Sequence, residues 1–169
     1  MSHNSRHAIF ALLPMLLASS LGLAQEVKPQ YTIKDEVRTG SNIRRDQVTG
    51  FKVAMNLPFE KLPAADRAQL NSLYEHIAEG DEPPFPLKGL QMIYEPLREA
   101  NNKLYDRGQL SMLATVDAEG AVQEVKLLQS PSPEMTRFAA NLLYLIRFKP
   151  AKCGGKACVM DFPVRLSFE

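Results

Sequence analysis

The chain has 169 residues, of which 45% are hydrophobic, and its formal net charge at neutral pH is +1. A chain of this length can bury one hydrophobic core and carry a small appendage. Because basic and acidic residues nearly balance, we expect no nucleic-acid partner and no charge-driven binding to an anionic membrane surface.

The first 24 residues (1–24) have the pattern of a secretory signal peptide. Arg6 precedes an apolar run, 8–24, that is rich in Leu and Ala and ends with Gly22 and Ala24 at the small-residue positions before a cleavage site. Cleavage after Ala24 removes Arg6 from the 20 basic residues and leaves 19, against 19 acidic residues. The alternative is an uncleaved membrane anchor, since the run is at the lower limit of length for crossing a bilayer.

Residues 25–83 are interpreted as an N-terminal extension with two strands and a helix. Strand-like alternation occurs over 31–37 and 51–55. A helix is predicted over 63–79, with Gly80 at its C-terminal end. Its apolar face contains Leu70, Leu73, Tyr74 and Ile77.

A proline-rich stretch, 81–86, separates this extension from the rest of the chain, and we place the start of the main domain, 84–169, within it. A helical pattern follows over 87–107. Pro96 either kinks this helix or starts a second one, and Gly108 ends it.

The remaining chain predicts a strand, a strand, a helix and a strand. Period-two alternation indicates strands over 109–117 and 122–127, joined by a turn that contains Gly120. Ser132 has the features of a helix N-cap, with proline at the first helical position. The fold class is therefore α+β, a small antiparallel three-stranded sheet packed by helices.

The final strand is predicted over 156–168, and its residues alternate strictly between two faces. The face expected to reach the core carries Met160, Phe162, Val164, Leu166 and Phe168. The face expected to meet water carries Val159, Asp161, Pro163, Arg165 and Ser167.

Cys153 and Cys158 are the two cysteines of the chain. In an exported protein, two cysteines with four residues between them most simply form a disulfide, here across the loop before the final strand. Closing so short a loop removes only about 2 kcal/mol of unfolded-state entropy. A redox pair would normally have a C-x-x-C spacing at a helix start, and a zinc site would need two further ligands.

No pattern of catalytic residues emerges from the sequence. The serines have no histidine at a suitable spacing, and the carboxylate pairs lie in turns or loops. His76, the single histidine left after cleavage, is interpreted as a surface residue because it has no partner. We expect no enzymatic activity, no cofactor and no bound metal.

Several fragments together resemble the C-terminal domain of the TonB energy-transducer family. They are Gly108-Gln-Leu110, Val116-Asp117, Gly120-x-Val122-x-x-Val125, Ser130, Ile146-Arg-Phe-Lys-Pro-Ala151, Gly154-Gly155 and Phe162-Pro-Val-Arg-Leu-Ser-Phe168. An aromatic–proline pair precedes the first helix in such domains, and Phe85-Pro86 and Tyr94-x-Pro96 are both candidates for it. The chain departs from the family pattern over 87–107, which is longer than expected.

The resemblance implies a ββαβ core, a place in the periplasm of a Gram-negative envelope, and a role related to TonB-dependent transport. TonB-like domains engage an extended segment of an envelope or outer-membrane transporter protein through their last strand. Carried over to this chain, the partner-binding residues are Ala157, Val159, Asp161, Pro163 and Arg165. Pro163 fits an edge strand because it has no N–H, and for the same reason it weakens pairing with an added strand.

Two other roles stay open at the level of sequence. The edge strands could pair with each other in a homodimer, which would make this a structural envelope protein with no role in transport. Alternatively, a chain that keeps 1–24 as an anchor would be a membrane-attached energy transducer.

Overall fold

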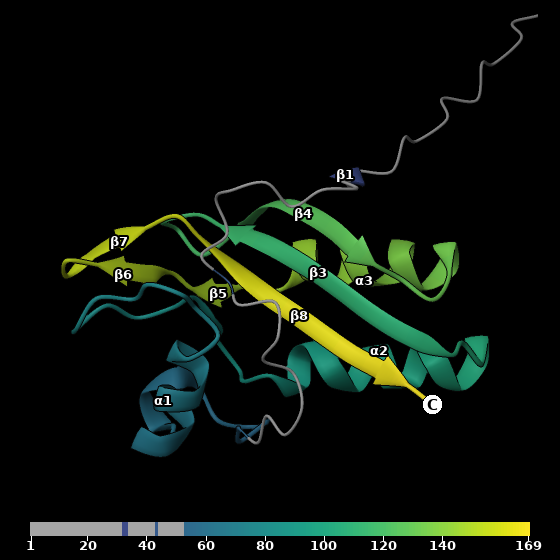
Figure 1. Ribbon diagram of the computed structural model, residues 1–169, viewed down its shortest axis with the longest axis horizontal. Helices are drawn as coiled ribbons and strands as arrows, with labels where there is room; N and C mark the ends of the chain where they lie inside the picture. Colours follow the sequence, from purple (N-terminus) through teal and green to yellow (C-terminus); the bar gives the residue numbers. More distant parts are fainter. Residues whose placement is uncertain (1–31, 34–42, 44–52) are drawn as a thin grey trace, which may run out of the picture.

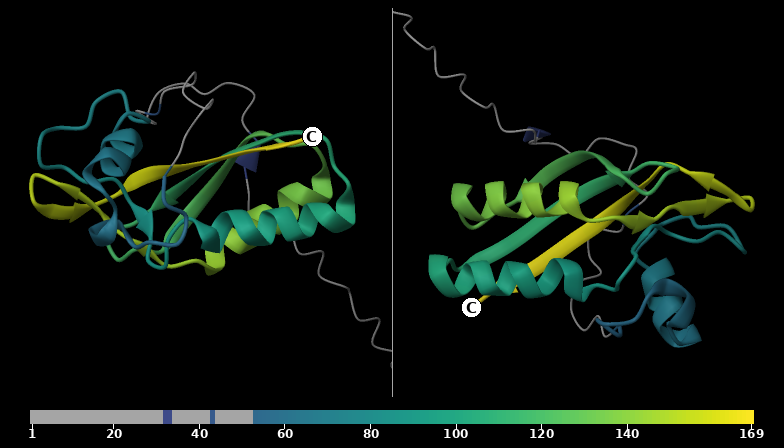
Figure 2. Two further views of the ribbon diagram at one scale, coloured as in Figure 1. Left: turned by 90° about the horizontal axis from the view of Figure 1, so that it is seen from below. Right: turned by 180° about the vertical axis from the view of Figure 1, so that it is seen from behind.

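The computed structural model describes residues 32–33, 43 and 53–169, and they form a mixed α+β structure (Figure 1). The expected signal, 1–24, lies outside the described residues. The long strands form one sheet, and the two longest helices lie together on one of its faces (Figure 2).

The predicted hairpin is confirmed and forms the centre of the sheet. β3 (Gly108–Val116) and β4 (Val122–Gln129) are antiparallel. Asp117 shapes the turn between them, because its carboxylate accepts two backbone N–H groups at 3.0 and 2.8 Å. Gly120 completes the turn with a φ of +80°, a conformation that other residues adopt only with strain.

The last strand and a short N-terminal strand extend the sheet on its two sides. β8 (Met160–Phe168) pairs antiparallel with β3, and β1 (Thr32–Ile33) pairs parallel with β4. The strand order is β1-β4-β3-β8, so three antiparallel strands are present as predicted, and β1 adds a parallel fourth. Of the strand predicted over 31–37, only these two residues are described.

The helical layer consists of α2 (Gln91–Leu104) and α3 (Pro133–Leu145). Ser132 caps α3 as predicted, since its hydroxyl oxygen accepts the Met135 N–H at 3.1 Å. α2 runs through Pro96 as one helix, so no second helix begins there.

The main core lies between this helical layer and the sheet. The large side chains that are fully buried are Phe85, Leu90, Ile93, Leu97, Leu110, Met112, Met135, Leu143, Val116, Val125 and Val164. A smaller cluster of Ile43, Tyr74 and Leu113 lies on the opposite face, because Leu113 alternates with the core-facing residues of β3. Both faces of the sheet are thus packed by the chain itself.

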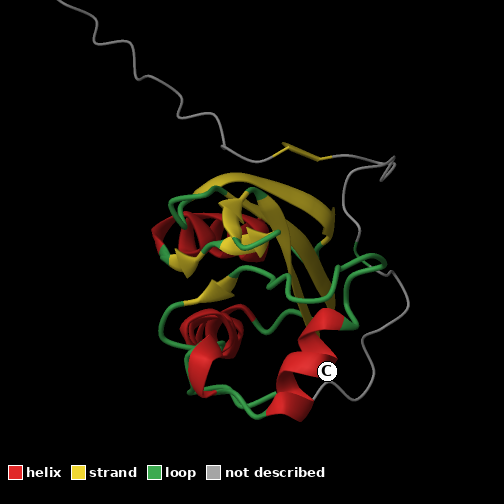
Figure 3. Cartoon of the chain, turned by 90° about the vertical axis from the view of Figure 1, so that its left-hand side faces the viewer, coloured by secondary structure: helices red, strands yellow, loops and turns green. Residues whose placement is uncertain are grey.

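The segment before Phe85 packs against the same core. It contains η1 (Phe59–Lys61) and α1 (Ala64–Asn71), and α1 lies apart from the helical layer (Figure 3). The buried residues of this segment that join the main core are Val53, Phe59, Leu62 and Leu70.

Two predictions for this segment were wrong. The helix predicted over 63–79 ends at Asn71, because Tyr74 leaves the helical path to form an isolated antiparallel bridge with Ile43. Residues 53–55, the described part of the strand predicted over 51–55, pair with no strand in the described chain. Instead, the Ala54 N–H binds the Asp66 carboxylate at 2.8 Å.

Short strands tie the proline-rich stretch to the chain after α3. β2 (Phe85–Pro86) pairs antiparallel with β5 (Phe148–Lys149). β6 (Ala151–Cys153) and β7 (Lys156–Cys158) form a small hairpin that projects from the end of the sheet (Figure 1). The final strand predicted over 156–168 is therefore two strands, β7 and β8, and the break falls at Val159.

Gly120→Ala should destabilise the fold far more than Gly80→Ala. Both glycines have a positive φ, but a Cβ at Gly120 would lie 2.0 Å from the Phe148 carbonyl oxygen, whereas nothing lies within 4 Å of one at Gly80. We expect about 1–2 kcal/mol of backbone strain for Gly80→Ala and at least about 3 kcal/mol for Gly120→Ala. Urea unfolding of both variants measures this difference, and equal midpoints would contradict the close approach.

Candidate functional site

Among the strands of the described residues, β8 is the last one on its side of the sheet. It pairs along its whole length with β3, from Met160 opposite Val116 to Phe168 opposite Gly108. An antiparallel strand directs alternate backbone groups toward and away from its neighbour. The groups of β8 that point away from β3 form the outer edge, the place where a further strand could add.

Pro163 determines which residues form this outer edge. Pro163 lies opposite Leu113 in β3, and it has no N–H to donate. It therefore cannot belong to a pair that exchanges two hydrogen bonds, so it occupies a non-hydrogen-bonded pair. By alternation, the backbone groups that face outward are those of Asp161, Pro163, Arg165 and Ser167.

The carbonyl group of Asp161 at this outer edge already has a partner from within the chain. The Tyr74 hydroxyl donates a hydrogen bond to the Asp161 backbone oxygen at 3.0 Å. The Tyr74 ring is buried against Ile43 and Leu113 on the face of the sheet opposite the helices. Burial, and then the negative charge of Asp161, raises the pKa of the Tyr74 hydroxyl, so it remains a donor at neutral pH.

A second tyrosine reaches the same edge from the helical side. Tyr94 belongs to α2, and burial raises the pKa of its hydroxyl above the ordinary value of 10.0. A backbone hydrogen bond from Arg165, and then the positive charges of Arg165 and Arg98, act in the opposite direction. A hydrogen bond that favours the phenolate must be donated to its oxygen, so the Arg165 N–H is the donor.

The Asp161 side chain is held by residues of the neighbouring strands. The Thr115 hydroxyl donates to the Asp161 carboxylate at 2.6 Å, and the Lys126 ammonium lies 3.8 Å from it. Lys126 also lies 3.6 Å from the Glu124 carboxylate. This group ties β4, β3 and β8 together across the face opposite the helices, with the single cation of Lys126 between two carboxylates.

The five residues predicted to bind a partner do not form one continuous edge. Ala157 lies in β7 and pairs with Lys152, and Val159 lies between β7 and β8, where 62% of its surface is exposed. These two positions are a correction, because the hairpin of β6 and β7 turns the chain away before the sheet begins. Asp161, Pro163 and Arg165 lie on the outer edge of β8, and their binding of a partner stays a prediction.

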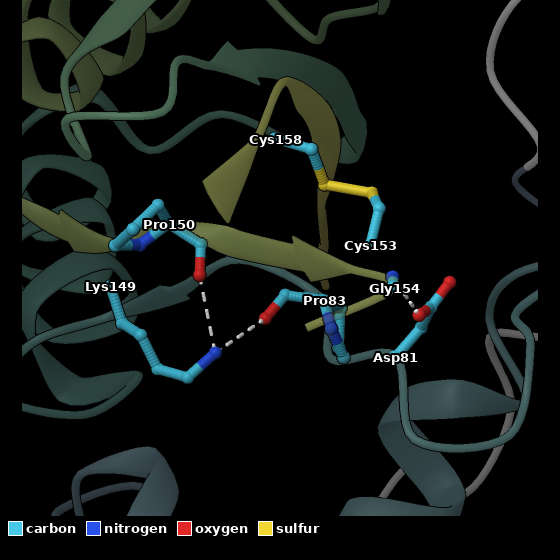
Figure 4. Close-up of a disulfide and its surroundings, with 7 residues drawn as sticks. All are labelled: Asp81, Pro83, Lys149, Pro150, Cys153, Gly154 and Cys158. Carbon is cyan, nitrogen blue, oxygen red and sulfur yellow. Dashed lines mark hydrogen bonds between the residues drawn. A yellow bond between two sulfur atoms is a disulfide. The ribbon is translucent and has the colours of Figure 1, made fainter. Parts of the chain in front are cut away.

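The predicted disulfide is present and closes the hairpin of β6 and β7 (Figure 4). The Cα atoms of Cys153 and Cys158 are 5.9 Å apart. Within the loop that they close, the Gly154 N–H donates to the Asp81 carboxylate at 2.7 Å. The disulfide thus helps to hold the hairpin against the start of the proline-rich stretch.

Lys149 binds the same proline-rich stretch, and only 8% of its surface is exposed. Its ammonium lies 2.9 Å from the Glu82 carboxylate and 4.3 Å from the centre of the Phe59 ring. It also donates to the backbone oxygens of Pro83 and Pro150 at 3.3 and 3.2 Å (Figure 4). A buried cation needs such partners, because losing them would leave an uncompensated charge.

Sequence reasoning missed the roles of Tyr74 and Tyr94. Both fell on apolar helical faces, where a tyrosine is most simply part of a core. The signal that bears on them is Pro163, which implies an outer edge with one donor missing. It does not indicate which side chains lie beside that edge.

No family model matches the chain, and no curated protein matches it either. Over 32–33, 43 and 53–169, no helix combines the length and apolar character needed to cross a membrane. Within the same residues, no three His, Cys, Asp or Glu side chains are grouped as metal ligands would be.

Segments 81–87 and 147–154 pair with each other in a short ladder, and Glu82 makes the stability of this ladder depend on pH. Burial alone would raise the pKa of this carboxyl, but the hydrogen bonds and charges of Lys149 and then Lys152 outweigh it and lower the pKa below 4.5. A lowered pKa in the folded state contributes stability that is complete above 4.5 and is lost as the pH falls through the folded-state value.

The stability difference between the wild type and Glu82→Gln should therefore be constant near neutral pH and shrink below pH 4.5. Urea unfolding from pH 7 to pH 3 measures it. Glu79→Gln, which removes an exposed carboxylate outside this ladder, is the matched control. A difference for Glu82→Gln that stays unchanged down to pH 3 would show that the ion pair with Lys149 does not contribute.

Proposed function

We propose that this chain is an exported protein-binding domain, similar to the TonB C-terminal domain, that binds an extended segment of an envelope protein. The observation that carries the proposal is the position of β8, which pairs with β3 on one side and ends the strand order on the other. A further strand added there would gain backbone hydrogen bonds along its length. The outer row ends at Ser167, whose side chain is exposed.

The order of elements supports the resemblance on which the proposal draws. From Gly108 onward the chain runs strand, strand, helix, a small hairpin and strand. Phe85-Pro86 precedes α2, whereas Pro96 lies inside that helix, and this order favours Phe85-Pro86 over Tyr94-x-Pro96 as the proposed aromatic–proline pair. The proposed setting is the periplasm, with a segment of an outer-membrane transporter as the partner.

Self-association through the same edge is the competing role. Two copies of β8 could pair across a two-fold axis, with Pro163 in each copy removing one hydrogen bond from the new ladder. This competing role predicts that a cross-link formed at the edge joins two identical chains. The proposed function predicts an adduct with a different envelope protein.

Photo-cross-linking in intact cells tests the proposal. A photoreactive amino acid replaces Val159, the exposed residue just before β8, or Ser167, the last residue of the outer edge, and a third variant carries it at Leu145, an 82% exposed position on α3. We expect one defined envelope protein to be captured from Val159 and Ser167 but not from Leu145. Equal capture from all three positions, or adducts of two identical chains only, would overturn the proposed function.

A further inference from the structure

The outer edge of β8 lacks free backbone partners at several of its outward-facing positions. The Asp161 oxygen accepts from Tyr74, Pro163 has no N–H, and the Arg165 N–H donates to Tyr94. These are three consecutive outward-facing residues. An incoming strand therefore finds the Asp161 acceptor and the Pro163 and Arg165 donors missing from a complete ladder.

The two hydroxyls approach this edge from opposite faces of the sheet. Tyr74 belongs to the cluster with Ile43 and Leu113, on the face opposite the helices, and Tyr94 belongs to α2. A hydroxyl bonded to an edge group lies about 3 Å from it, within the distance of roughly 4.8 Å at which a paired strand runs. Each hydroxyl thus occupies space that the backbone of an added strand would need.

Resting on the proposed function, we infer that the hydroxyls of Tyr74 and Tyr94 close the β8 edge in the free protein, and that the partner segment binds only after both release it. The same closure protects the edge from pairing with a second copy, which is the hazard that every exposed sheet edge presents. The chain before Phe85 supplies one of the two closing groups, Tyr74. Movement of that segment would therefore regulate access to the edge.

Tyr74 is the closing group that can leave without unfolding a helix. It lies after the end of α1, where its N–H donates to the Asn71 oxygen at 3.1 Å, and its backbone forms an isolated bridge with Ile43. Tyr94 lies in the body of α2, so its hydroxyl releases the edge by side-chain movement alone. The partner segment therefore displaces a residue of the N-terminal extension at its Asp161 end and a helical side chain at its Arg165 end.

Conservative variants separate this closure from a packing role. Tyr74→Phe and Tyr94→Phe keep each ring and remove only the hydroxyl, and Tyr105→Phe, at an 82% exposed position, is the matched control. The first measurement is amide hydrogen exchange of Arg165 in the purified protein. We expect Tyr94→Phe to speed this exchange about 2- to 12-fold, the factor that the net contribution of one hydrogen bond gives, and Tyr105→Phe to leave it unchanged.

The second measurement is the yield of the cross-linked adduct from Ser167 in intact cells, with each tyrosine variant added in turn. Tyr74→Phe and Tyr94→Phe should each raise the yield by about the same 2- to 12-fold, and the double variant should raise it further. The mass of the adduct distinguishes an envelope protein from a second copy of the chain.

The outcomes separate the closure from the proposed function. Faster exchange at Arg165 with no adduct other than pairs of identical chains would support the closure and overturn the proposed partner. Unchanged exchange in Tyr94→Phe would overturn the closure, whatever is captured. An envelope-protein adduct formed in equal yield with and without the hydroxyls would also overturn it, because the edge would then be open in the wild type.

Discussion

Pro163 determines which backbone groups of the last strand point away from the sheet. Because it cannot donate, Pro163 occupies a pair with Leu113 in which the backbone groups point away from β3. By alternation, the backbone groups of every second residue of β8 point outward as well. The same residue that permits β8 to lie at an edge removes one donor from that edge. The functional properties of the domain then depend on what lies beside the remaining outward groups.

The chain before the main domain contributes to those surroundings. Its residues from Val53 to Leu70 bury side chains in the common core, and it continues to Tyr74 at the β8 edge. The buried Lys149, paired with Glu82, and the disulfide hairpin hold the proline-rich stretch that follows. At the other edge of the sheet, β1 pairs with two residues of β4. The N-terminal part of the chain therefore contacts both edges of the three antiparallel strands.

Local signals predicted the central elements well. Alternation over β3 and β4, the turn at Gly120 and the N-cap at Ser132 act over a few residues, and each was confirmed. The disulfide followed from spacing and from the expectation of export. The α+β class followed from the order of these elements.

Tertiary contacts decided the features that sequence could not supply. Alternation continues unbroken through Val159, but the hairpin closed by Cys153 and Cys158 draws 156–158 into a separate ladder with 151–153. The helical pattern of 63–79 is real in the sequence, yet Tyr74 gains a bridge with Ile43 and a bond to Asp161 by leaving it. From sequence alone, a tyrosine on an apolar face is interpreted as a core residue, and only the structure shows what its hydroxyl binds.

The central claim is that two hydroxyls of the chain itself close the outer edge of β8. Labelling tyrosine with ¹³C at Cζ and following each resonance from pH 8 to pH 12 tests it most directly in the free protein. Burial and the negative charge of Asp161 favour the neutral phenol of Tyr74, so Tyr74 should remain protonated as the pH passes its ordinary value of 10.0. Half-titration of the Tyr74 resonance near pH 10 while the protein stays folded would show that its hydroxyl meets solvent, and would contradict the closed edge.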